Sequence, residues 1–115
     1  DIYQVETDQN EIFAYPNPFS PSRDNVVNGD GYIRFFTGQN PVGSAKMSVY
    51  NFAMEKVLSR WYDRNIDGGE LKWDGKDNSG YLVANGVYFV NLEVFNYLYP
   101  DRGLQDHWIK VIIVK

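Results

Sequence analysis

The chain has 115 residues, no cysteine, 17% aromatic residues and a formal net charge of −4. This length predicts one domain, and the lack of cysteine excludes disulfides and thiolate metal sites. The negative charge argues against nucleic acids and anionic membranes as partners, because basic patches supply the affinity for both.

Apolar and polar residues alternate along most of the chain, which predicts strands. The expected strands, in chain order, are 12–15, 32–37, 46–51, 56–63, 70–73, 87–96 and 107–115. Prolines after the first strand suit an extended segment at a sheet edge. Good helix formers make a helix the alternative for 52–62, but the β-branched and aromatic residues there favour a strand.

Seven short strands separated by turn signals predict an all-β fold, a seven-stranded antiparallel Ig-like or fibronectin III-like β-sandwich. We expect this domain to span 12–115 and to follow a linker, 1–11, from an upstream domain. No apolar run approaches the ~20 residues of a membrane span. The alternation predicts the following inward side chains: Ile33, Phe35, Met47, Val49, Val57, Trp61, Leu71, Trp73, Tyr88, Val90, Leu92, Val94, Ile109, Val111 and Ile113.

Acidic and amide side chains gather in the stretch "WDGKDNSGYLVANGVYF", residues 73–89. An EF-hand calcium loop that started at Asp74 would need an oxygen ligand at the position of Lys76, so the EF-hand motif is excluded. A non-helical calcium loop that uses Asp74, Asp77 and Asn78 as ligands remains the alternative. We expect a structural loop, in which carboxylates accept backbone hydrogen bonds and glycines allow positive φ. Its residues are Asp74, Gly75, Asp77, Gly80 and Gly86, and the flanking Trp73 and Tyr88 are expected in the core, with the Tyr88 hydroxyl bonded to backbone.

Four blocks carry a family resemblance: "AYPNPFSP", "MSVYNFAMEKV", "WDGKDNSGYLVANGVYFV" and "WIKVIIVK". In this order they resemble an FlgD-type Ig-like domain and are similar to the C-terminal sorting domains of bacterial type IX secretion cargo. The turn at 53–55 and the longer last hairpin depart from that pattern. The resemblance implies an Ig-like module at or near the C-terminus of an exported multidomain protein, with a structural or address-like role.

Candidate catalytic residues are few. His107 is the only histidine, whereas a triad needs partners for its histidine and zinc sites usually use several His or Cys ligands. Paired carboxylates could serve glycosidic chemistry, but most acids fall in turns or on polar strand faces. The sequence therefore predicts a protein that is not an enzyme and that has no metal site or cofactor.

Exposed aromatic side chains suggest the main alternative function. Tyr97, Tyr99 and Trp108 flank the last hairpin, and Phe36 and Tyr62 fall on the outward sides of their strands. Flat rings stack on sugars, so a carbohydrate-binding module is the alternative. The same rings could instead pack under loops or against a neighbouring domain, because large apolar patches usually mark interfaces.

Partner recognition is expected at the C-terminal strand. Lys110 and Lys115 are the candidate recognition residues, beside an exposed strand edge. Lysines also protect apolar edge strands from pairing with other chains, so both roles remain open. The expected partners are upstream domains of the same chain and the secretion machinery. The isolated domain is expected to be a monomer, and the parent protein to be secreted or at the cell surface.

Overall fold

Seven strands make up the regular structure of the described chain. The computed structural model describes residues 13–21, 31–36, 44–63, 71–95, 101, 103 and 105–115, so the expected linker lies outside the described residues. The strands are β1 (Phe13–Tyr15), β2 (Ile33–Phe36), β3 (Ser44–Tyr50), β4 (Lys56–Asp63), β5 (Leu71–Trp73), β6 (Gly86–Phe95) and β7 (Gln105–Ile113). No helix in these residues is long and apolar enough to cross a membrane.

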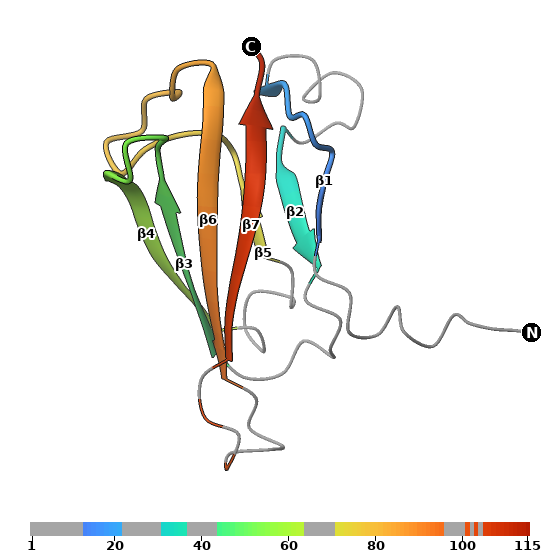
Figure 1. Cartoon of the computed structure of the whole chain (residues 1–115), viewed down its shortest axis with the longest axis vertical. Helices are drawn as coiled ribbons and strands as arrows, with labels where there is room; N and C mark the ends of the chain where they lie inside the picture. Colours follow the sequence, from blue (N-terminus) through green and yellow to red (C-terminus); the bar gives the residue numbers. More distant parts are fainter. Residues whose placement is uncertain are drawn as a thin grey trace, which may run out of the picture.

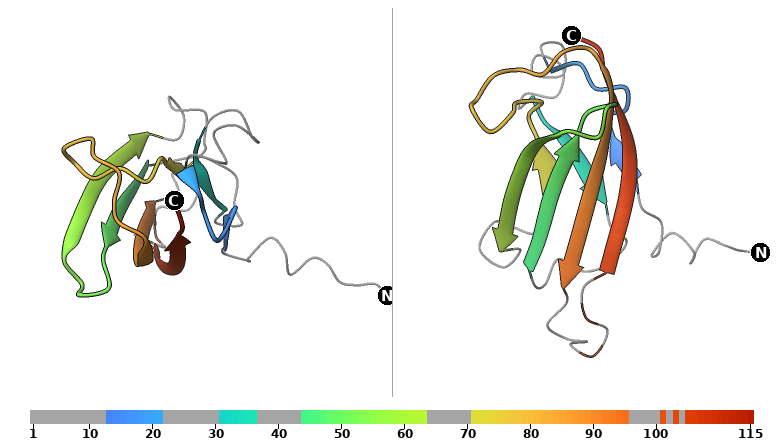
Figure 2. Two further views of the ribbon diagram at one scale, coloured as in Figure 1. Left: turned by 90° about the horizontal axis from the view of Figure 1, so that it is seen from above. Right: turned by 60° about the vertical axis from the view of Figure 1, so that its left-hand side comes forward.

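The strands form two sheets that face each other. One has the order β1-β2-β5 and the other the order β4-β3-β6-β7, and every pair is antiparallel. Figures 1 and 2 show the two layers, with the long β6 and β7 side by side and the chain crossing between layers after β5. The predicted antiparallel Ig-like β-sandwich is confirmed, and 56–63 is a strand and not a helix.

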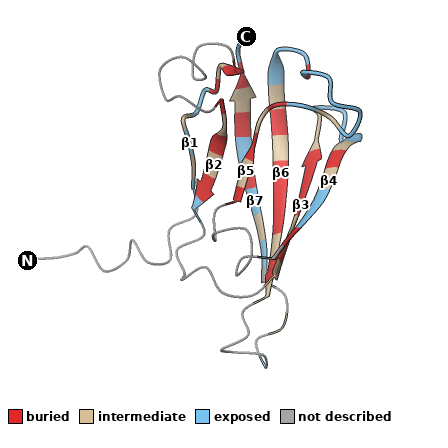
Figure 3. Ribbon diagram, turned by 180° about the vertical axis from the view of Figure 1, so that it is seen from behind, coloured by how far each residue is buried: buried red, intermediate tan, exposed pale blue. Residues whose placement is uncertain are grey.

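The core lies between the sheets, and Figure 3 shows buried segments on strands of both layers. Strand alternation places one apolar side chain in every two toward it, which stabilises the fold by roughly 1.5–3 kcal/mol for each fully buried large side chain. The largest fully buried residues are Trp73, Phe19, Ile33, Met47, Leu71, Leu92, Ile113, Val49, Val90 and Val111.

One predicted facing is wrong on β4. Trp61, expected inward, is 63% exposed, and Tyr62, expected outward, is 7% exposed. A register shift between Val49 and Tyr50 of β3 marks a bulge in this pair. Val57 and Leu58 are consecutive residues, yet both pack toward the core there. The alternation of inward and outward side chains along β4 is therefore shifted by one residue after Val57. Tyr62 then donates its hydroxyl hydrogen to the carbonyl oxygen of Lys72 at 2.7 Å.

Candidate functional site

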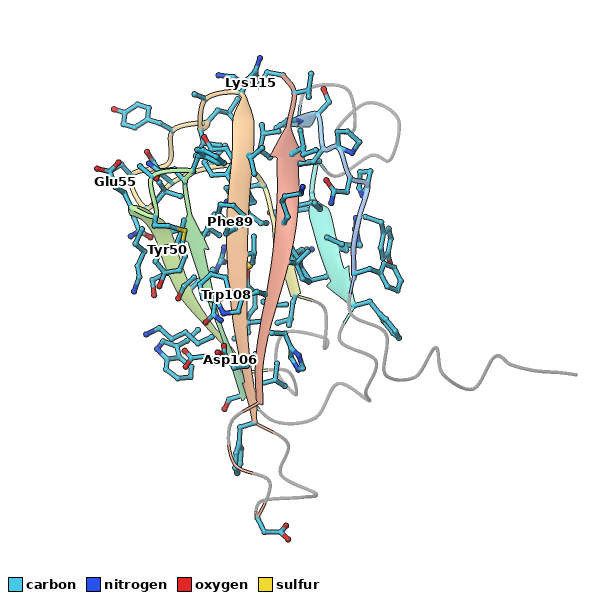
Figure 4. The ribbon with its side chains drawn as sticks, in the orientation of Figure 1. Tyr50, Glu55, Phe89, Asp106, Trp108 and Lys115 are labelled. Carbon is cyan, nitrogen blue, oxygen red and sulfur yellow. The ribbon has the colours of Figure 1, made fainter. Side chains whose placement is uncertain are left out.

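The C-terminal strand is firmly part of the sandwich. Ile109, Val111 and Ile113 of β7 are buried, whereas Lys110 is exposed between them. Lys115 is also exposed, and its backbone N–H donates to Asn85 Oδ1 at 2.8 Å. Both lysines therefore present their side chains outside the core, and Figure 4 shows Lys115 at the end of the chain.

The outer edge of β7 is occupied near these lysines. Asn17 Nδ2 donates to the Lys110 carbonyl at 3.0 Å, and the Ile112 N–H donates to Asn17 Oδ1 at 3.1 Å. The Phe19 N–H donates to the Ile112 carbonyl at 2.8 Å, and the Val114 N–H donates to the Phe19 carbonyl at 2.9 Å. The expectation of an exposed strand edge is wrong for 110–114, because the segment after β1 fills it (Figure 1).

The opposite outer strand, β4, is covered in a similar way. The Asn78 N–H donates to the Val57 carbonyl at 3.1 Å, and Asn78 Oδ1 accepts the Ser59 N–H at 3.3 Å. Asn78 belongs to the acidic loop, so this loop closes part of the β4 edge. Sequence reasoning did not single out Asn17, and it named Asn78 only as a possible ion ligand.

The acidic loop is held by its own backbone. Asp74 Oδ1 accepts the Lys76 N–H at 3.1 Å, while Asp77 Oδ1 accepts the N–H groups of Ser79 at 2.9 Å and Tyr81 at 3.0 Å. Gly75 and Gly80 have φ of 81° and 90°, values that favour glycine. Among the residues that the structure describes, no three His, Cys, Asp or Glu side chains gather as metal ligands. These contacts are those of the expected structural loop, which ends where Gly86 begins β6.

Trp73 and Tyr88 brace the loop from the core side. Trp73 is 2% exposed, and its Nε1–H donates to the Lys76 carbonyl at 2.8 Å. The Tyr88 hydroxyl donates to the Ala84 carbonyl at 2.7 Å, and the two rings meet edge to face at 5.8 Å. Burial raises the pKa of the Tyr88 hydroxyl above its ordinary value, because the phenolate form would lose its hydration.

Exposed apolar side chains surround the C-terminal end of the sandwich. This end comprises the β3–β4 turn, the loop between β5 and β6, and the residues after β7 (Figure 1). Its exposed apolar residues are Phe52, Met54, Tyr81, Leu82 and Val114. None of them was predicted as a site residue, because single apolar residues in turns carry no periodic signal.

The outer face of the four-stranded sheet holds a second group of aromatic rings. Trp108 is 53% exposed, and its ring lies 5.6 Å from that of Tyr50 (Figure 4). Phe52 stacks on Phe89 at 6.2 Å. Tyr97 and Tyr99, the other members of the expected sugar platform, lie outside the described residues. Phe36 is exposed as expected, but on the other sheet, where it contacts Phe13.

His107, half-buried on β7, accepts a 3.5 Å hydrogen bond from Asn91 through its backbone carbonyl. That contact involves no imidazole atom. The candidate contacts for a partner are the exposed lysines, the exposed apolar side chains and the stacked rings described above.

Comparisons with known proteins bear on the fold. No protein-family model matches the chain, and no curated protein matches it. Among solved structures, part of PorZ, an essential bacterial surface component of the type IX secretion system of Porphyromonas gingivalis, is similar over 95% of this chain, with a TM-score of 0.60 and 16% identity. Part of dimeric latent PorU from the same bacterium is similar over 90% of this chain, with a TM-score of 0.56 and 21% identity.

This chain spans 12% of the PorZ chain and 9% of the PorU chain. At these identities the likeness shows a shared fold. It agrees with the Ig-like sandwich of the sorting-domain resemblance, while the FlgD part of that resemblance stays an expectation from the sequence. The chain thus has a β-sandwich fold that also occurs within a surface component of the type IX secretion system.

Proposed function

We propose that this chain is a non-catalytic accessory module of an exported bacterial protein and that it acts in type IX secretion through protein–protein contacts. The observation that carries the proposal is the similarity of 95% of the chain to part of PorZ. The sorting-domain resemblance of the sequence blocks supports the same secretion system. The parent protein would then be secreted or held at the cell surface.

The proposed recognition surface is the C-terminal end of the sandwich. Lys110 and Lys115 supply positive charge there, and Phe52, Tyr81 and Val114 supply exposed apolar surface. An apolar patch with a charged border is typical of protein interfaces. Because Asn17 and Phe19 occupy the β7 edge, the partner would read side chains and would not add a strand beside 110–114.

A reporter fusion tests this proposal. The whole chain would be attached to the C-terminus of a fluorescent reporter in a bacterium that has a type IX system, and surface export would be measured. We expect export with the native chain and impaired export with Lys110→Ala/Lys115→Ala. The matched control is Lys46→Ala/Lys56→Ala, which removes the same charge from β3 and β4.

Two outcomes would contradict parts of the proposal. If the native fusion stays inside the cell, the module is better described as a spacer or an interdomain brace. If the native fusion and the Lys110/Lys115 variant are exported equally, the two lysines protect the strand and are not read by the partner.

A further inference from the structure

The first half of β7 has an uncovered outer edge. β7 is the last strand of the four-stranded sheet (Figure 2). The residues that follow β1 bond the outward backbone of Lys110, Ile112 and Val114. Among the described residues, none forms a backbone hydrogen bond with the outer edge of β7 before residue 110.

The alternation of the backbone identifies the groups on this uncovered edge. Successive residues of a strand direct their N–H and C=O groups to opposite sides. Ile112 bonds outward with both its N–H and its carbonyl, whereas the His107 carbonyl is turned toward Asn91 of β6. The even-numbered residues of β7 therefore face outward, and Asp106 and Trp108 present their N–H and C=O groups at the uncovered edge.

The side chains along this edge carry a self-complementary charge pattern. Asp106, Trp108 and Lys110 occupy alternate positions, so their side chains lie on the same face of the sheet, and all three are exposed. Asp106 and Trp108 follow one another along β7 (Figure 4). A negative charge thus lies two residues before the tryptophan and a positive charge two residues after it.

We propose that two copies of this chain associate through β7, as antiparallel strands centred on Trp108. The two Trp108 residues then lie opposite each other, and each Asp106 lies opposite the Lys110 of the other copy. Such a contact is isologous, which requires that one surface patch complements itself. Opposite charges and aromatic rings that face each other across two strands both favour this pairing.

The backbone groups support the same pairing. The N–H and carbonyl of Trp108 can bond those of Trp108 in the second copy, and the Lys110 N–H can donate to the Asp106 carbonyl across the contact. The Lys110 carbonyl already accepts from Asn17 at 3.0 Å, so the paired stretch ends at residue 110. The two four-stranded sheets would join into one continuous sheet.

The charge pattern selects this register against others. A shift by two residues would place Asp106 opposite Trp108 and would lose both charge pairs. A parallel arrangement in register would bring each charge beside its own copy, and like charges that face each other across strands are destabilising. Charges on an edge strand usually prevent pairing, but Asp106 and Lys110 prevent the parallel arrangement and favour the antiparallel one.

The expected dimer is weak. Contacts that bury less than about 1,200 Å² are typical of transient complexes, and for one short strand pair we expect a Kd on the order of 0.1 mM. The monomer expected from the sequence then describes the chain in dilute solution. This self-association goes beyond the proposed role in export and does not depend on it.

Sedimentation equilibrium of the whole chain, from micromolar to millimolar concentration, tests the proposal. We expect a monomer–dimer equilibrium for the native chain. Asp106→Lys and Lys110→Glu should each weaken association by about tenfold or more, because both charge pairs become repulsive. The double variant Asp106→Lys/Lys110→Glu should restore it. Lys56→Glu makes the same charge change on β4 and should associate as the native chain does.

A mixture of the two single variants gives the sharpest result. Opposite charges meet again when Asp106→Lys pairs with Lys110→Glu, so a mixed dimer should form where neither variant associates alone. Native mass spectrometry identifies it by its mass. A native chain that stays monomeric, single variants that associate as the native chain does, or a double variant or mixture without regained association would each overturn the proposal.

Melting curves by circular dichroism separate lost association from lost folding. Asp106→Lys removes the acceptor of the Asn91 amide, whereas Lys110→Glu leaves this contact in place. If Asp106→Lys does not fold, Lys110→Glu still decides the proposal, since unchanged association of this variant would overturn it. Association is measured on the purified chain, so its outcome is separate from that of the export experiment.

Discussion

Asn17 and Asn78 cover the two outer strands of the same sheet, Asn17 through its side-chain amide and Asn78 through its backbone N–H and side-chain oxygen. Asn17 bonds the backbone of Lys110 and Ile112 on β7, and Asn78 bonds the backbone of Val57 and Ser59 on β4. Each asparagine provides one donor and one acceptor to an outer strand. Edges filled in this way are closed to strand addition by another chain.

Replacing Asn17 should therefore expose part of the β7 edge. We expect Asn17→Ala to lower the free energy of unfolding by about 1–3 kcal/mol, since two hydrogen bonds of about 0.5–1.5 kcal/mol are lost. Urea denaturation measures this, and light scattering should show more aggregation. Asn17→Asp keeps the acceptor for the Ile112 N–H, so its free energy of unfolding should lie between those of the native chain and Asn17→Ala. Native stability and solubility in Asn17→Ala would contradict the edge-covering role.

Two tryptophans give a matched test of the core. Trp73→Ala should lower the free energy of unfolding by about 3–5 kcal/mol, the usual cost of emptying a buried large aromatic site, because Trp73 is 2% exposed. Trp61→Ala, at a position 63% exposed, should cost less than about 1 kcal/mol. Chemical denaturation compares them, and equal losses would contradict the assignment of Trp61 to the outer face.

The sequence predicts the strands well because their apolar alternation is local. It fails on Trp61 and Tyr62, two adjacent aromatic residues whose facing is decided by a bulge opposite β3. The covering of β7 by Asn17 is also beyond sequence reasoning, since these partners are 93 and 95 residues apart. The contact between the Trp108 and Tyr50 rings depends on the registers of β3, β6 and β7, so Trp108 could be suspected from the sequence but its neighbour Tyr50 could not.

The acidic loop should be independent of calcium. Thermal melts with calcium and with a chelator should coincide, because Asp74 and Asp77 already accept backbone hydrogen bonds. A ligand at 100 times its Kd adds about 2.7 kcal/mol, so a clear rise in Tm with calcium would contradict this prediction.

The same hydrogen bonds predict the effect of changing Asp77. Asp77→Asn keeps an oxygen acceptor for the Ser79 and Tyr81 N–H groups and should stay close to native stability. Asp77→Ala leaves both donors without this partner and should lower the free energy of unfolding by about 1–3 kcal/mol. Chemical denaturation distinguishes the variants, and equal stability of both would argue that the loop does not depend on the Asp77 side chain.

Tyr88 should make the fold sensitive to alkaline pH. Its pKa is raised in the folded state by burial, so the unfolded chain loses this proton first as the pH rises. The contribution of Tyr88 to stability is present below pH about 10 and is lost as the pH rises from there toward the folded pKa. Tyr88→Phe should reduce this alkaline loss in pH-dependent urea denaturation, and an unchanged profile would contradict it.

The C-terminal strand should be indispensable for folding. Deleting 108–115 removes Ile109, Val111 and Ile113, each 9% exposed or less. Each buried side chain contributes roughly 1.5–3 kcal/mol, so the loss of about 4.5–9 kcal/mol approaches the whole stability of a typical domain. The deletion also removes the backbone partners of Asn17 and Phe19.

We expect the truncated chain to be unfolded or insoluble, as judged by circular dichroism and sedimentation. Lys110→Ala/Lys115→Ala is the control. Both side chains are exposed, and the backbone bond from residue 115 to Asn85 does not need the lysine side chain. Surface changes of this kind usually alter stability by no more than about 0.5 kcal/mol. A truncated chain that melts cooperatively would mean that β1–β6 form a sufficient core, and the C-terminal strand would then be free to serve recognition alone.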